Sequence, residues 1–98
     1  MTWSVVFRRP ARREFDEAAL WYEQRHSGLG ADFTAEVERA VMFLTEHPQR
    51  LPVMHRDVRC ARVRRFPYSV FFRIESTRII VLAVFHARRN PIVWQRRV

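Results

Sequence analysis

The sequence predicts an α+β fold whose elements follow the order βααβββ. Three observations lead to this prediction. A short segment rich in β-branched and aromatic residues precedes two amphipathic helical segments, the apolar spacing changes from helical to alternating beyond Pro52, and a short turn separates the last two apolar runs. We therefore expect the N-terminal strand and a helical hairpin to pack on one face of a small antiparallel sheet, with arginines on the uncovered face.

The first elements are a strand and a long helix. Thr2–Phe7, with the sequence TWSVVF, has the composition of a strand. Pro10 suits the first turn of a helix, because an N–H group is not needed there. Apolar residues recur at helical spacing over Ala11–His26, and the segment HSGLG then ends the helix.

The second helix follows after a very short connection. Ser27 is the expected N-terminal cap, and Pro48 marks the end. The tight connection predicts that the two helices pair antiparallel, with their acidic side chains on the outer faces. The stripe expected to face the sheet consists of Phe33, Val37, Ala40, Val41 and Leu44.

Three strands are expected after the helices. DVRCARVRR alternates weakly, YSVFFRIE alternates clearly, and RIIVLAVFH is apolar on both faces, as a central strand is. A turn at Glu75–Thr77 joins the last two. The residues expected to face the helices are Ala61, Val63, Tyr68, Val70, Phe72 and Ile74. The residues expected to face away are Cys60, Arg62, Arg64, Ser69, Phe71, Arg73 and Glu75.

Length and cysteine content bound the class of protein. Ninety-eight residues predict a single domain over residues 1–98. The longest apolar run, Ile79–Phe85, is too short to span a bilayer, and the first residues do not resemble a signal peptide. The lone Cys60 excludes an internal disulfide and suits the reducing cytoplasm, where we expect the protein to act. A small core residue is its more common role.

The charge is segregated along the chain. All 18 basic residues are arginine. Residues 1–13 carry +4, residues 14–46 carry −6 and residues 47–98 carry +10, which together give the net charge of +8. Such segregation favours a polyanionic partner or target, although charge runs are also ordinary solvated surface.

The polar residues that end the last strand are the candidates for chemistry. The four histidines are scattered without metal-ligand spacing, so neither a metal nor another cofactor is expected. A metal-free RNA-cleaving site would use His86 as a base, with positive charge supplied by Arg59, Arg73, Arg88 and Arg89. The alternative is that these residues only form solvated surface. Trp94 would either anchor a partner or lie buried where the tail folds back on the sheet.

Four segments resemble a known family. They are ARREFDEAALWYEQR, GLGADFTAEVERAVMFLTEHP, VRCARVRRFPYSVFFRIE and IIVLAVFHARRNPIVW, and the pairing of FPYSVFFR with HARRNP is the most specific part. The chain resembles toxins of the RelE/ParE superfamily from bacterial type II toxin–antitoxin modules, closest to the ParE branch. The resemblance implies a compact toxin neutralised by a small antitoxin, whose C-terminal segment wraps the toxin and whose N-terminal domain binds operator DNA.

The superfamily has two activities, and the residues favour one. RelE-like members cut mRNA on the ribosome, whereas ParE-like members are poisons of DNA gyrase. Ser69 stands where the ribonuclease branch has a strand arginine, Trp94 stands in a tail without tyrosine, and lysine is absent. We therefore expect a non-enzymatic gyrase poison whose target-binding residues are Arg73, His86, Arg88, Arg89 and Trp94. The alternatives are a ribosome-dependent endonuclease that uses Arg59, Arg73, His86 and Arg88, or an inactivated relative that only binds its antitoxin.

An antitoxin is also expected from the charge distribution. Residues 47–98 form a strongly basic surface, and a chain that brings carboxylates would relieve its self-repulsion. Arginine holds a carboxylate with two parallel hydrogen bonds. Arg62 and Arg64 are the expected antitoxin contacts.

Overall fold

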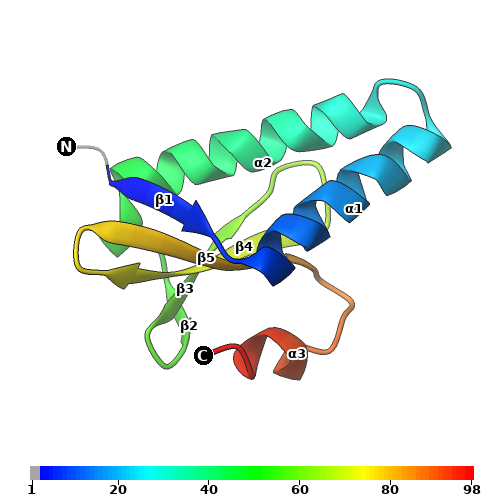
Figure 1. Cartoon of the computed structure of the whole chain (residues 1–98). Coiled ribbons are helices and arrows are strands. Elements are labelled where there is room, and N and C mark those ends of the chain that lie inside the picture. The colour runs from blue at the N-terminus through cyan, green and yellow to red at the C-terminus, as the bar shows by residue number, and fades with distance from the viewer. Residues whose placement is uncertain (1–2) are drawn as a thin grey trace.

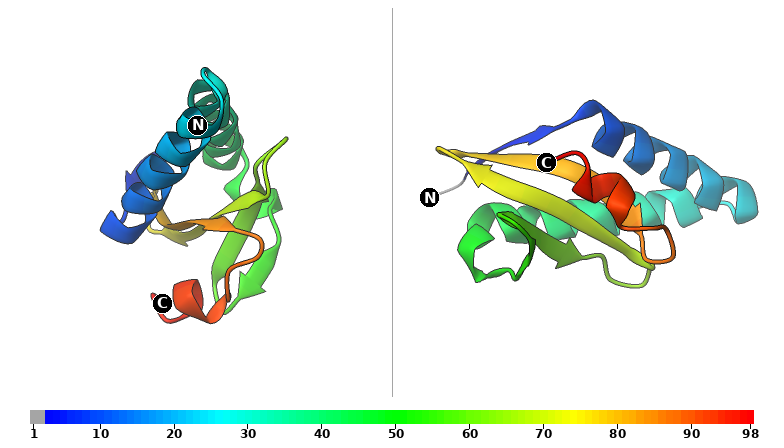
Figure 2. Two further views of the ribbon diagram at one scale, coloured as in Figure 1. Left: turned by 90° about the vertical axis from the view of Figure 1, so that its right-hand side faces the viewer. Right: turned by 90° about the horizontal axis from the view of Figure 1, so that it is seen from below.

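The computed structural model describes residues 3–98 as a five-stranded mixed sheet between a helical hairpin and a short C-terminal helix (Figure 1). The strands lie in the order β1-β5-β4-β3-β2. Figure 2 shows the hairpin and the C-terminal helix on opposite sides of the sheet. The elements are β1 Ser4–Phe7, α1 Arg9–Arg25, α2 Leu29–Glu46, a 3-10 turn Pro48–Arg50, β2 Val53–His55, β3 Val58–Arg62, β4 Tyr68–Glu75, β5 Arg78–His86 and α3 Ile92–Gln95.

The predicted α+β class and order of elements are confirmed, with two differences in the sheet. β1 pairs with β5 in parallel, with Val5 beside Ile79, so that only the pairings among β2, β3, β4 and β5 are antiparallel. The sheet also gains the short strand β2 at its other edge. Thr2, the first residue of the predicted strand, lies outside the described residues.

The alternation of side chains in β4 follows the prediction. Val70 and Phe72 are fully buried beneath the helical hairpin, and Tyr68 and Ile74 pack against the same cluster. Phe71 points to the other face of the sheet. β5 is buried on both faces because the two hydrophobic clusters lie on either side of it. Its position inside the sheet, between β1 and β4 and covered on both faces, explains its unbroken apolar sequence.

The second face of the sheet is partly covered, contrary to the expectation that it would be open. The tail turns back through α3, and Trp94 stacks on Phe71 with ring centroids 4.1 Å apart. Cys60 and Phe85 belong to the same buried cluster. The tail thus supplies a second small core under the sheet.

The helical hairpin is closed by a glutamate, and the prediction that Ser27 caps α2 is wrong. Gly28 precedes α2 with φ of +89°, and no serine hydroxyl caps the helix. The Glu23 carboxylate instead accepts hydrogen bonds from the N–H groups of Gly28, at 3.0 and 3.1 Å, and Gly30, at 3.0 Å. Gly30 is also a close approach, because an added Cβ would lie 2.6 Å from the carbonyl oxygen of Ala19.

The sequence predicted that the acidic side chains of both helices lie on the outer faces, but two of them are largely buried. Glu36 of α2 is 8% exposed and pairs with Arg39 at 3.0 Å. The side chain of Glu14 in α1 is 11% exposed. Within residues 3–98, no helix combines the length and the apolar character that crossing a membrane requires.

Candidate functional site at the end of β5

A groove runs beside α1 where β4 begins and β5 ends. Tyr68 and His86 are partners in the strand register, and their ring centroids are 5.1 Å apart with nearly perpendicular planes. The groove has a volume of 470 Å³, and we call it the α1–β5 groove. Its lining residues are Glu14, Glu17, Ala18, Trp21, Tyr22, Tyr68, Val84, His86 and Arg89.

The two tyrosines of the groove are held in their neutral form. Burial raises the pKa of Tyr22 above its ordinary value. Burial also raises the pKa of Tyr68, and nearby Tyr22 and Glu14 act in the same direction while Arg89 opposes them. Both phenols therefore keep their protons at neutral pH. They can donate hydrogen bonds there, but they are not bases.

His86 is fixed in one tautomer by the backbone N–H group of Arg88. The N–H group of Arg88 donates to Nδ1 of His86 at 3.0 Å. A nitrogen that accepts a hydrogen bond carries no proton, so the neutral ring carries its proton on Nε2. In this arrangement His86 offers a hydrogen-bond donor to the surface. Nδ1, the nitrogen that could act as a base, is already engaged.

Glu14 connects α1, β5 and the C-terminal tail. Its Oε1 accepts from the N–H group of Val84 at 3.1 Å and from Arg97 Nη1 at 3.0 Å. Its Oε2 accepts from Arg89 Nη1 at 2.7 Å and from Arg97 Nη2 at 2.9 Å. Arg97 Nη1 also donates to the carbonyl oxygen of Leu82 at 3.0 Å. We call these contacts the Glu14 network.

The four residues expected in a ribonuclease site are not brought together. His86 and Arg88 lie at the end of β5, whereas Arg59 donates to the carbonyl oxygens of Gln49 and Leu51 at 3.2 and 2.6 Å. Arg73 lies five residues along β4 from the partner of His86, about 17 Å away at the usual rise per residue.

Arg73 also faces the opposite side of the sheet from Tyr68, the strand partner of His86. Its Nε lies 3.6 Å from a carboxylate oxygen of Asp57. That nitrogen is buried without a hydrogen-bond partner. Positive charge from Arg73 is therefore not available at the end of β5.

The expected target-binding residues divide into exposed and engaged groups. Arg88 is exposed, and His86 is partly exposed. Arg89 is held by Glu14 and lies over the Phe85 ring, with its guanidinium carbon 4.3 Å from the centroid. Trp94 is 3% exposed, so the buried alternative holds and its assignment to a target-binding surface is corrected. It is the anchor of the tail.

The remaining sequence candidates lie on β3 and in the loop after it. Cys60 is buried, and burial raises the pKa of its thiol, which suits the predicted core role. Arg62 and Arg64 are exposed and have no acidic partner among the described residues, so both are accessible for an antitoxin contact. Among residues 3–98, no three His, Cys, Asp or Glu side chains are placed to hold a metal ion.

Sequence reasoning missed Glu14 and Arg97, the residues that join the two ends of the chain. One signal was present. Glu14 is the first acid of the chain and follows directly after the arginine-rich segment RRPARR at the start of α1. An acid in that setting has partners close by, but the sequence does not show that the principal one is 83 residues away.

Comparisons with known proteins agree with this fold. The chain is similar over 89% of its length to a structure described as the chromosomal ParDE TA system from P. aeruginosa, with a TM-score of 0.75, 20% identity and 98% of that chain covered. It is similar over 88% of its length to the toxin–antitoxin complex RelBE2 from Mycobacterium tuberculosis, with a TM-score of 0.62, 26% identity and 99% of that chain covered. No curated protein matches the chain.

The family comparison covers most of the sequence. Residues 5–91 match the model of the ParE toxin of the type II toxin-antitoxin system, parDE. That range extends from β1 through β5 into the loop that carries Arg88 and Arg89. The chain therefore belongs to the ParE toxin family of type II toxin–antitoxin systems.

Proposed function

We propose that this toxin arrests growth by binding DNA gyrase and trapping it on cleaved DNA, and that a cognate antitoxin neutralises it. The observation that carries the proposal is the dispersal of the candidate ribonuclease residues. RNA cleavage without a metal requires a base, a cation and an acid around one phosphate. Here Arg73 lies far from His86 and on the other face, and Nδ1 of His86 is occupied. A toxin that does not bring a base, a cation and an acid together acts by binding its target.

The end of β5 is the surface we assign to the gyrase contact. Arg88 is exposed, and His86 presents Nε2 beside the α1–β5 groove. Arginine is frequent among residues that dominate binding energy, because one guanidinium makes several directed hydrogen bonds. His86 and Arg88 are thus binding residues in this proposal and need not transfer protons.

The family and the exposed positive charge both support an antitoxin as a partner. Both solved neighbours are described as toxin–antitoxin systems, which supports an antitoxin as a partner of this chain. Arg62 and Arg64 are exposed on and just beyond β3. Their guanidinium groups are free to hold carboxylates of a partner that folds on binding.

Purified gyrase with plasmid DNA tests the proposal directly. The toxin is expected to inhibit supercoiling and to increase cleaved plasmid recovered after denaturation of the enzyme. Arg88→Ala should weaken inhibition by about thirtyfold, since a dominant interface arginine contributes about 2 kcal/mol. Arg78→Ala is the matched control, because Arg78 begins the same strand at its opposite end and, within residues 3–98, pairs only with Glu75 at the surface.

Two results would overturn the proposal. The first is a folded wild-type toxin that leaves gyrase activity unchanged. The second is codon-phased cleavage of mRNA after induction, mapped by primer extension, that disappears in both His86→Ala and Arg73→Ala. Growth that continues normally after strong induction without antitoxin would instead indicate an inactive relative.

A further inference from the structure

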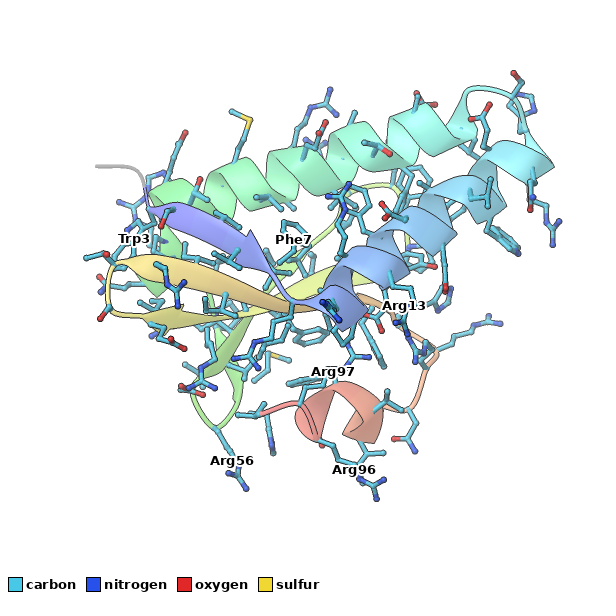
Figure 3. The ribbon with its side chains drawn as sticks, viewed as in Figure 1. Trp3, Phe7, Arg13, Arg56, Arg96 and Arg97 are labelled. Atoms are coloured by element: carbon cyan, nitrogen blue, oxygen red, sulfur yellow. The ribbon has the colours of Figure 1, made fainter. Side chains whose placement is uncertain are left out.

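Arg89 and Arg97 of the C-terminal segment meet at Glu14 of α1, and further arginines flank these residues in the chain. These two arginines lie 75 and 83 residues after Glu14 in the sequence. Figure 3 shows Arg13 and Arg97 between α1 and α3, with Arg96 on the outer side of the tail. We call this surface the terminal arginine cluster, and it consists of Arg9, Arg13, Arg88, Arg89, Arg96 and Arg97.

Contacts with Glu14 fix the positions of two members of the cluster. Arg89 and Arg97 bind the same carboxylate oxygen, at 2.7 and 2.9 Å, so their guanidinium groups are close neighbours. Arg13 precedes Glu14 in α1, and Arg9 lies one turn earlier on the same helix face. Arg88 and Arg96 directly precede Arg89 and Arg97, the two arginines that bind Glu14.

The charge of the cluster is far from balanced. Glu14 already accepts hydrogen bonds from both Arg89 and Arg97, and Glu17, one turn after Arg13, is a second carboxylate beside these residues. Arg9, Arg13, Arg88 and Arg96 are exposed and have no acidic partner among residues 3–98. Exposed like charges that outnumber the nearby carboxylates repel one another, so an anionic ligand that contacts several of them is favoured.

The neighbouring aromatic rings indicate which kind of polyanion fits. Single-stranded nucleic acid is typically held by exposed rings that stack on its bases. Phe85 and Trp94, the rings beneath the cluster, are each 3% exposed, and their faces are covered by Arg89 and Phe71 respectively. The Glu14 network itself therefore offers guanidinium groups without stacking platforms, which suits the closely spaced phosphates of a duplex. The exposed ring of Trp21 lines the adjacent α1–β5 groove and is the stacking surface that single-stranded nucleic acid would use.

We propose that the terminal arginine cluster binds the phosphate backbone of duplex DNA. The choice of DNA over duplex RNA rests on the proposed function, because gyrase holds a DNA duplex. A toxin bound at gyrase would then contact the enzyme through the end of β5 and the DNA through the cluster, and Arg88 belongs to both surfaces. Those contacts are adjacent, because Arg88 and Arg89 follow directly on His86.

The test measures binding of the isolated toxin to a short random-sequence duplex over a series of salt concentrations. The variant replaces Arg9, Arg13, Arg88 and Arg96 with Gln, which leaves the Glu14 network in place. The control replaces four other exposed arginines, Arg50, Arg56, Arg62 and Arg64, with Gln and so has the same net charge. Circular dichroism and thermal unfolding confirm that both variants are folded.

We expect the cluster variant to bind duplex DNA at least about tenfold more weakly than the control does. Its slope of log K against log salt should fall by about 0.9 for each phosphate that the variant no longer neutralises, and the slope of the control should stay near that of the wild type. Equally weakened binding by the two variants would show that net charge alone attracts DNA, and the proposal would fail.

Binding of poly-glutamate, single-stranded DNA and duplex RNA distinguishes the remaining explanations. Poly-glutamate bound as tightly as the duplex would overturn the proposal in favour of an acidic protein partner, and tighter binding of single-stranded DNA or of duplex RNA would overturn the choice of duplex DNA. Because gyrase is absent from this experiment, the two proposals fail separately. A toxin that binds duplex DNA through the cluster but leaves gyrase unaffected would overturn only the proposed function.

Discussion

Glu14 in α1 and Arg97 in the tail form two parallel hydrogen bonds, at 3.0 and 2.9 Å, across 83 residues of sequence. The pair lies at the side of β5 that β1 leaves uncovered, since β1 ends opposite Val81. There Glu14 accepts the Val84 N–H group, and Arg97 donates to the Leu82 carbonyl oxygen. Two side chains thus satisfy backbone groups of an otherwise open strand edge.

Removal of the Glu14 carboxylate should therefore loosen the tail. We expect Glu14→Gln to lower the free energy of unfolding by about 1–3 kcal/mol, because partly buried donors of Arg97 and Val84 are left without a charged acceptor. Urea unfolding measures this decrease, and hydrogen exchange at the Val84 amide should become faster. Glu17→Gln, one turn later on the exposed face of α1, is the control and should change stability by less than about 0.5 kcal/mol. An unchanged Val84 exchange rate would contradict the role of Glu14.

Trp94 should hold the second core closed. We expect Trp94→Ala to destabilise the protein by about 3 kcal/mol, because it removes a buried ring stacked on Phe71. Burial raises the pKa of the Cys60 thiol, so little reactive thiolate is present at neutral pH. The variant should let that pKa fall toward its ordinary value and speed labelling by a thiol reagent. Ile92→Ala, in the same helix but exposed, should leave labelling slow; equal labelling of both would argue against the anchor.

Glu23 should make the hairpin sensitive to acid. Hydrogen bonds from the N–H groups of Gly28 and Gly30 lower the pKa of Glu23 in the folded state. A lowered folded pKa contributes stability that is fully present above the ordinary glutamate pKa and is lost as the pH falls through the folded value. The unfolding midpoint of Glu23→Gln should therefore fall less in acid than that of the wild type. Parallel curves for the two proteins would contradict this, and Glu38→Gln, an exposed acid of α2, serves as the control.

Charge reversal on β3 tests the proposed antitoxin contact. Arg62→Glu combined with Arg64→Glu should slow association of the antitoxin and flatten its salt dependence, because the two arginines would no longer steer carboxylates. Stopped-flow association from low to high salt measures both effects. Arg50→Glu with Arg56→Glu carries the same charge change elsewhere and should have a smaller effect. An antitoxin that binds the first variant at the wild-type rate throughout would be held by other surfaces.

Side-chain parity was the most predictable part of the fold. The alternation of β4 placed Val70 and Phe72 under the helices and Phe71 on the other face, because successive residues of a strand point to opposite sides. Parity carries no information about strand direction, however. The parallel pairing of β1 with β5 depends on how the helical hairpin returns the chain, and the sequence does not display it.

Contacts between distant residues explain the other differences. Ser27 is the residue type that usually caps a helix, but the left-handed conformation of Gly28 lets Glu23 reach back to the same N–H groups. The candidate site was only partly predicted for a similar reason. His86 and Arg88 are together because they are neighbours in sequence, whereas the position of Arg73 depends on the face and length of β4.

The parallel pairing of β1 with β5 has a consequence for the order of folding. β5 leaves the ribosome after the other four strands of the described sheet, yet it is the partner of both β1 and β4. The N-terminal strand must therefore remain unpaired until more than 70 further residues have been made, and contacts of such long sequence separation form slowly. The contact between Glu14 and Arg97 can form only later, because Arg97 is made after β5. Until β5 has been made, a nascent chain thus carries its arginines without the sheet that aligns them.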